Sequence, residues 1–86
     1  AGKSLADLQT LYSKVEIGMT QAQVEEAGGK PTKTTEDERG TVMTFSESGL
    51  GNSFVDVILK DGSVTSVTFN DRSSSSQNIQ TKGAEE

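Results

Sequence analysis

The feature that most constrains the fold is a pair of alternating segments, residues 53–60 and 63–70, which are joined by Asp61 and Gly62. Both segments are rich in Val, Ile, Phe and Thr, the residue types that β-strands favour. Asp-Gly between two such segments is a strong hairpin signal. The sequence therefore predicts an antiparallel hairpin, and residues 41–46 have the composition of a further strand beside it.

Two registers are compatible with this hairpin. A two-residue loop places the larger residues of the first segment, Val55, Val57 and Leu59, beside Val64, Ser66 and Thr68. A three-residue loop, with Gly62 in the left-handed conformation, places them beside Thr65, Val67 and Phe69. A slip of one residue moves every side chain of a strand to the other face. The three-residue loop is favoured because it gathers the larger side chains on one face, which Met43 and Phe45 are expected to join.

Before residue 31 the apolar residues follow a helical period. Ser4 is expected to cap a first helix with an apolar side made of Leu5, Leu8, Leu11, Tyr12 and Val15. A second helix is expected to begin at a capping box formed by Thr20 and Gln23. Gly28 is expected to end it as a left-handed residue. This helix is barely two turns long, so tertiary packing must hold it.

Together these elements predict an α+β fold in which two short N-terminal helices pack on one face of a three-stranded antiparallel sheet, in the order ααβββ. The domain is expected to span residues 4–70. Residues 1–3 have the character of a leader or cloning remnant. Residues 71–86 hold one large aliphatic side chain, Ile79, and are predicted to be a flexible tail. A cloning remnant or a linker is an equal alternative for that stretch.

Composition excludes several classes of function. The chain has no His and no Cys, so it lacks an imidazole base, a thiolate nucleophile and the usual zinc ligands. Its net charge of -5 argues against binding to nucleic acid. No apolar run approaches the roughly 20 residues of a membrane span. The acidic run 36–38 is expected to be a solvated loop. We therefore expect a protein that is not an enzyme and that uses no cofactor and no metal.

Two surfaces are candidates for binding another protein. In the favoured register Phe54, Ile58 and Val64 lie on the sheet face that points away from the helices, where they could form an apolar patch with a polar rim. The alternatives are that they are scattered surface hydrophobic residues, which are common, or that a second layer which covers this face is missing. The loop over residues 47–53, with Leu50 and Asn52, is the second candidate. An unpaired edge at the first or third strand would allow strand addition, so a monomer or a weak dimer is expected.

Two segments of the chain resemble a known family. They are Ile17-Gly18-Met19-Thr20, with Val24, Gly29 and Pro31 after it, and Asp61-Gly62-Ser63-Val64. This pattern resembles the SmpA/OmlA family of small bacterial outer-membrane lipoproteins and the β-lactamase-inhibitor-protein-like domains that share their architecture. The resemblance covers about residues 11–69, and its matched positions are turns, caps and core residues. It therefore transfers no binding residue to this chain.

The resemblance implies an extracytoplasmic protein of the bacterial cell envelope that acts by binding other proteins. Such proteins are often lipid-anchored, and because this chain has no lipobox cysteine, an anchor is expected only upstream of Ala1. A non-enzymatic envelope interaction domain is thus the leading hypothesis. An inhibitor of a secreted or periplasmic enzyme, and a structural or sensory module of a longer surface protein, are the alternatives.

Overall fold

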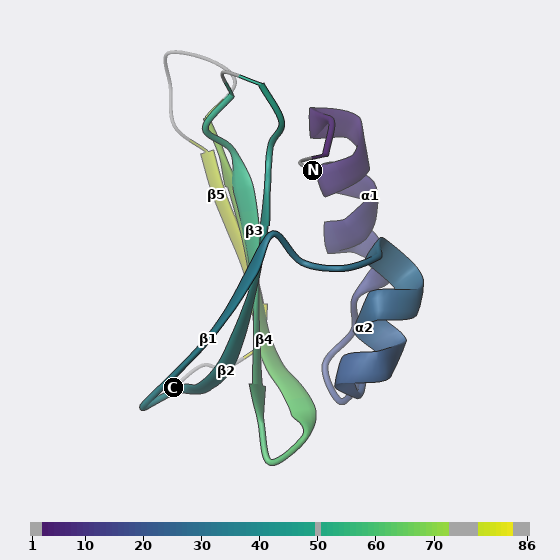
Figure 1. Cartoon of the computed structure of the whole chain (residues 1–86), viewed down its shortest axis with the longest axis vertical. Helices are drawn as coiled ribbons and strands as arrows, with labels where there is room; N and C mark the ends of the chain where they lie inside the picture. Colours follow the sequence, from purple (N-terminus) through teal and green to yellow (C-terminus); the bar gives the residue numbers. More distant parts are fainter. Residues whose placement is uncertain (1–2, 50, 73–77, 84–86) are drawn as a thin grey trace.

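The computed structural model describes residues 3–49, 51–72 and 78–83 (Figure 1). Within them two helices precede five strands: α1 (Leu5–Lys14), α2 (Gln21–Gly28), β1 (Lys33–Asp37), β2 (Gly40–Ser46), β3 (Phe54–Lys60), β4 (Ser63–Asp71) and β5 (Asn78–Gly83). The strands form one antiparallel sheet in chain order. Both helices lie on the same side of this sheet (Figure 1). The predicted α+β class is confirmed.

The predicted three-stranded sheet is wrong, because the described residues form five strands. β1 contains Glu36 and Asp37 of the acidic run that was expected to be a loop, and β5 lies in the stretch that was expected to be a tail. Both additional strands are at the edges of the sheet, and every residue of β1 is exposed. Backbone hydrogen bonds to one neighbouring strand hold such an edge, so its side chains need no alternating apolar pattern.

The β3–β4 hairpin starts in the register of a two-residue turn and changes register at a bulge. Its turn is the two-residue loop Asp61–Gly62, with φ of 55° and 84°, and Lys60 pairs with Ser63 across it. A β-bulge then shifts the register between Ile58 and Leu59, so that Ile58 pairs with Ser66. The favoured three-residue loop is therefore wrong. Beyond the bulge, Val55 and Val57 lie beside Val67 and Phe69 on the core face, so that part of the predicted grouping is confirmed.

Both helices begin where their caps predict. The Ser4 hydroxyl accepts a hydrogen bond from the Asp7 amide at 3.1 Å. The Thr20 hydroxyl accepts from the Gln23 amide at 3.2 Å, and the Gln23 side chain accepts from the Thr20 amide at 2.9 Å. Helix α2 includes Gly28, and its cap is Gly29, one residue later than predicted, with a positive φ of 79°.

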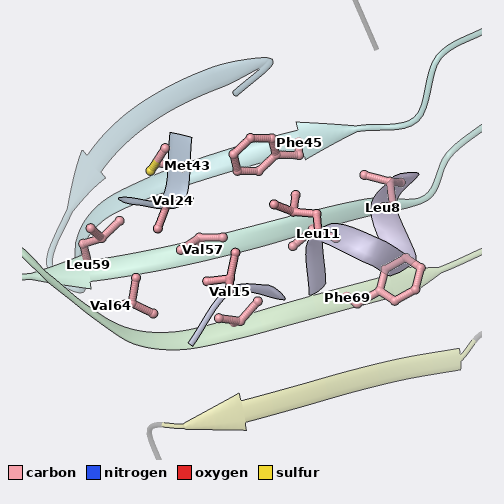
Figure 2. Packing of buried hydrophobic residues seen from close by; sticks show 12 residues of the cluster. Leu8, Leu11, Val15, Val24, Met43, Phe45, Val57, Leu59, Val64 and Phe69 are labelled. Carbon is pink, nitrogen blue, oxygen red and sulfur yellow. The ribbon is translucent and has the colours of Figure 1, made fainter. Parts of the chain in front are cut away.

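The core fills the space between the helices and the sheet. Figure 2 shows side chains from α1 and α2 directed toward those of the three central strands. The buried residues of the core come from both layers: Leu8, Leu11, Val15, Val24, Met43, Phe45, Val55, Val57, Leu59, Val64, Val67 and Phe69. Gly28 lets the helices approach, because a Cβ at this position would overlap the Leu11 side chain. On the same side of the sheet, the Lys82 ammonium of β5 lies 4.8 Å from the centroid of the Tyr12 ring.

Two segments outside the helices and strands hydrogen-bond to strand backbone groups that the neighbouring strands leave unpaired. Between the helices, the Gly18 amide donates to the Val64 carbonyl at 2.9 Å, and the Val64 amide donates to the Met19 carbonyl at 2.8 Å. At the end of β2, the Lys3 amide donates to the Ser46 carbonyl at 3.0 Å. The first contact joins the two segments that carry the family resemblance, so they form one local unit of structure.

Candidate functional site

The candidate site lies on the sheet face that points away from the helices, which we call the outer face. Side chains alternate between the two faces along a strand. Since Val55 and Val57 face the core, their neighbours on β3 face outward. The outer face of the three central strands consists of Val42, Thr44, Ser46, Phe54, Asp56, Ile58, Ser66, Thr68 and Asn70. The described residues contain no helix that covers this face (Figure 1).

An open hollow of about 350 Å³ lies on this face, across β1, β2 and β3. Its lining residues are Lys33, Thr44, Ser46, Phe54 and Asp56. Three ladder pairs bring them together: Lys33 pairs with Thr44, Thr44 with Asp56, and Ser46 with Phe54. Because residues that are opposite on adjacent strands share a face, the hollow is a direct product of the sheet register.

The chemistry of the hollow is that of a binding site with one aromatic wall. The Thr44 hydroxyl donates to the Asp56 carboxylate at 2.7 Å, which holds that carboxylate in place. Lys33 supplies an ammonium group from the strand on the other side of Thr44. Phe54 is partly exposed and contributes the apolar surface. The hollow thus offers one positive group, one oriented negative group and an aromatic ring to a ligand.

The predicted site residues fall into three groups. Phe54 and Ile58 lie on the outer face as expected, but Ile58 is only 9% exposed and packs in the centre of that face beside Val42. Val64, which was expected beside them, is 1% exposed and belongs to the core, because the two-residue turn places it opposite Leu59. Asn52 is exposed, and Leu50 lies outside the described residues. The predicted apolar patch therefore reduces to Phe54 as its accessible member.

Hydrogen bonds hold the two ends of the loop between β2 and β3. The Glu47 amide donates to the Ser53 carbonyl at 2.8 Å, and the Ser53 amide donates to the Glu47 carboxylate at 3.2 Å. The Ser53 hydroxyl accepts from the Arg72 amide at 2.8 Å. A Cβ at Gly51 would overlap the Glu47 carboxylate, so this contact requires glycine. The loop is anchored at both of its ends, and none of these contacts belongs to the hollow.

Sequence reasoning missed two parts of the surface. Lys33 was not considered as a site residue because β1 was not predicted, although its pairing with Thr44 puts it into the hollow. A second hollow of about 300 Å³ lies between the helices. It is lined by Lys3, Asp7, Thr10, Leu11, Lys14, Ala27 and Gly28. The glycine at position 28 is the one sequence signal that indicates a close approach of two elements there.

The acidic run contributes one exposed ion pair at the end of β1. The Arg39 guanidinium donates to the Asp37 carboxylate at 2.7 Å, and the Arg39 amide donates to it at 2.8 Å. The side-chain bond and then the backbone bond from Arg39 hold the pKa of Asp37 below its usual value. The same side-chain bond raises the pKa of Arg39. Both groups are therefore charged at neutral pH.

The described part of the chain contains neither a cluster of metal-ligating side chains nor a helix that could span a membrane. No three Asp or Glu side chains in it are grouped so that they could hold a metal ion. Neither α1 nor α2 has the length and apolar character to cross a membrane. No family model, no curated protein and no solved structure matches the chain. The resemblance to the SmpA/OmlA family accordingly stays a prediction from the sequence.

Proposed function

We propose that the protein is a non-enzymatic interaction domain of the bacterial cell envelope that binds another protein through the outer face of its sheet. The observation that carries the proposal is the hollow around Phe54. It combines an accessible aromatic ring with the Lys33 ammonium and the oriented Asp56 carboxylate. Aromatic residues surrounded by polar groups are typical of the anchor positions of protein interfaces.

The rigidity of the outer face supports this role. Phe54 and Asp56 belong to β3, which is hydrogen-bonded to a strand on each side. Beneath them Val55 and Val57 are fully buried against the helices. A surface built on packed strands loses little conformational freedom when a partner binds, and this loss is one of the main costs of association.

The envelope location is supported by the sequence resemblance alone. The residues that carry the resemblance lie in and around α2 and in the β3–β4 turn, and the two segments meet through the hydrogen bonds between Gly18, Met19 and Val64. None of these residues lines the hollow that presents Phe54. The two parts of the proposal can therefore be tested separately.

The binding surface is tested with Phe54→Asp and with Ile17→Asp as its matched control. Ile17 is 49% exposed and lies in the loop between the helices, away from the outer face. Both variants place one charge at a partly exposed apolar position. Pull-down from a bacterial envelope extract should recover a protein with the wild type and with Ile17→Asp but not with Phe54→Asp. Recovery of every partner by Phe54→Asp would contradict the proposed surface.

The location is tested by the residues that the gene encodes immediately before Ala1. A signal peptide that ends in a lipobox would agree with an anchored envelope protein. A start codon next to Ala1, with no such peptide, would contradict it. This result is independent of the pull-down, because it does not involve the outer face.

A further inference from the structure

Strand β1 has a free edge. It pairs with β2 on one side, and in the described part of the chain no strand lies on its other side. All five of its residues are exposed. An edge of this kind presents unpaired backbone N–H and C=O groups, which can pair with a strand of another molecule. The edges of β2 and β4 that their neighbours leave open are satisfied within the chain by Lys3 and by residues 18–19.

The charges of β1 are arranged so that two antiparallel copies of the strand place opposite charges beside each other. Lys33 stands at one end and Asp37 at the other, and both lie on the outer face, since their partners on β2 are Thr44 and Gly40. If two copies pair antiparallel about Thr35, each Lys33 lies opposite Asp37 of the second copy. Parallel pairing in the same register would instead put Lys33 beside Lys33 and Asp37 beside Asp37. Opposite charges across a strand pair stabilise it and like charges destabilise it.

We propose that two copies of this chain associate through their β1 strands, antiparallel and centred on Thr35. The two five-stranded sheets then form one continuous sheet. Within each copy, Arg39 already orients the Asp37 carboxylate through hydrogen bonds of 2.7 Å and 2.8 Å. Lys33 of the second copy meets a carboxylate whose position is set before association. The central pair, Thr35 beside Thr35, is a pair of β-branched residues, which strands favour.

The other edge strand does not offer the same complementarity. Residues 78–83 of β5 contain Lys82 and no acidic residue, so β5 paired with itself in the antiparallel sense gains no ion pair. Pairing of β1 with β5 of another copy would leave a free edge at each end and would produce chains of increasing length. A closed dimer through β1 is therefore distinguishable from β1–β5 association by mass.

The test is charge reversal, with mass measured by sedimentation equilibrium from micromolar to millimolar protein. The wild type is expected to be a monomer at the low end and to approach the dimer mass at the high end. Lys33→Glu is expected to raise the dimer dissociation constant by roughly 30-fold, because two symmetry-related contacts change from attraction to repulsion. Asp37→Lys is expected to have an effect of the same size. Lys14→Glu, an exposed change of the same charge on α1, is the matched control and should leave the constant unchanged.

The decisive sample is an equimolar mixture of Lys33→Glu and Asp37→Lys. In a mixed dimer the introduced glutamate of one chain faces the introduced lysine of the other, and the unchanged Asp37 of the first faces the unchanged Lys33 of the second. The mixture is therefore expected to recover the wild-type dissociation constant, although each variant alone dimerises more weakly. Circular dichroism establishes that each variant is folded. A wild type that stays monomeric, single variants that dimerise normally, a mixture that does not recover, or growth beyond the dimer would each overturn the proposal.

Discussion

Truncation of Val64 to alanine gives the sharpest test of the hairpin register. In the structure Val64 is 1% exposed and packs in the core opposite Leu59. In the three-residue-loop register, which the sequence favours, the same side chain would point to the outer face. The two registers therefore predict different free energies of unfolding for one conservative substitution.

The size of the effect follows from the burial. Val64→Ala removes two methyl groups, and each buried methylene-sized group contributes about 0.8 kcal/mol. The cavity that remains adds a further cost of roughly 1 kcal/mol. We expect the free energy of unfolding to fall by about 2 to 3 kcal/mol, which corresponds to a Tm lower by roughly 10 to 20 °C for a domain of this size. A substitution at a solvent-facing position changes stability by only about 0.5 kcal/mol.

Urea denaturation followed by circular dichroism measures this difference. Thr68→Ala is the matched control, because Thr68 lies on the same strand but on the outer face and is only partly buried. We expect a lower denaturation midpoint for Val64→Ala with an unchanged slope, and a midpoint for Thr68→Ala close to that of the wild type. A loss below about 0.5 kcal/mol for Val64→Ala would refute the two-residue turn.

Three further predictions concern the caps, the turn and the exposed ion pair. Thr20→Ala removes the capping box of α2 and should lower the free energy of unfolding by about 1 kcal/mol, measured by urea denaturation with Thr10→Ala on α1 as control. Gly62→Ala should cost about 1 to 2 kcal/mol in the same assay, because Gly62 has a φ of 84°. Arg39→Gln should raise the pKa of Asp37, which an NMR titration of the carboxyl carbon would show. In the wild type the lowered pKa of Asp37 means that the pair stabilises the fold above the ordinary carboxyl pKa, about 3.9. This contribution disappears as the pH falls through the lowered pKa. An unchanged pKa of Asp37 in Arg39→Gln would contradict Arg39 as the cause of the shift.

The helices and the three central strands were predictable because their signals are local. A cap such as Thr20 with Gln23 needs only the residues of one turn, and the structure forms both of its hydrogen bonds. The apolar faces of residues 41–46, 53–60 and 63–70 reflect burial against the helices, and Met43, Val57 and Val67 are fully buried. Burial on one side imposes the alternation that the sequence shows.

The edge strands were not predictable from the same signals. The side chains of β1 are all exposed, and the acidic run 36–38, which overlaps its end, is typical of a solvated loop. Its pairing depends on β2, which lies beside it only because the turn at residues 38–39 reverses the chain. The candidate site shares this dependence: Phe54 and Asp56 could be assigned to the outer face from their spacing, but Lys33 enters the hollow only through β1.

The sequence by itself determined which segments become helices and central strands and where the helices begin, since each of these depends on neighbouring residues. Tertiary structure decided the number of strands, the position of Val64 and the residues that meet at the hollow. The physical reason is that backbone hydrogen bonds hold an edge strand, and every residue type except proline can donate and accept them. The pairing of an edge strand therefore requires no particular pattern of side chains. The bulge between Ile58 and Leu59 acts in the same way. The extra residue of the bulge changes which residues of β4 face the helices, so that Val64, Val67 and Phe69 all lie in one core. A uniform alternation along β4 does not predict this set.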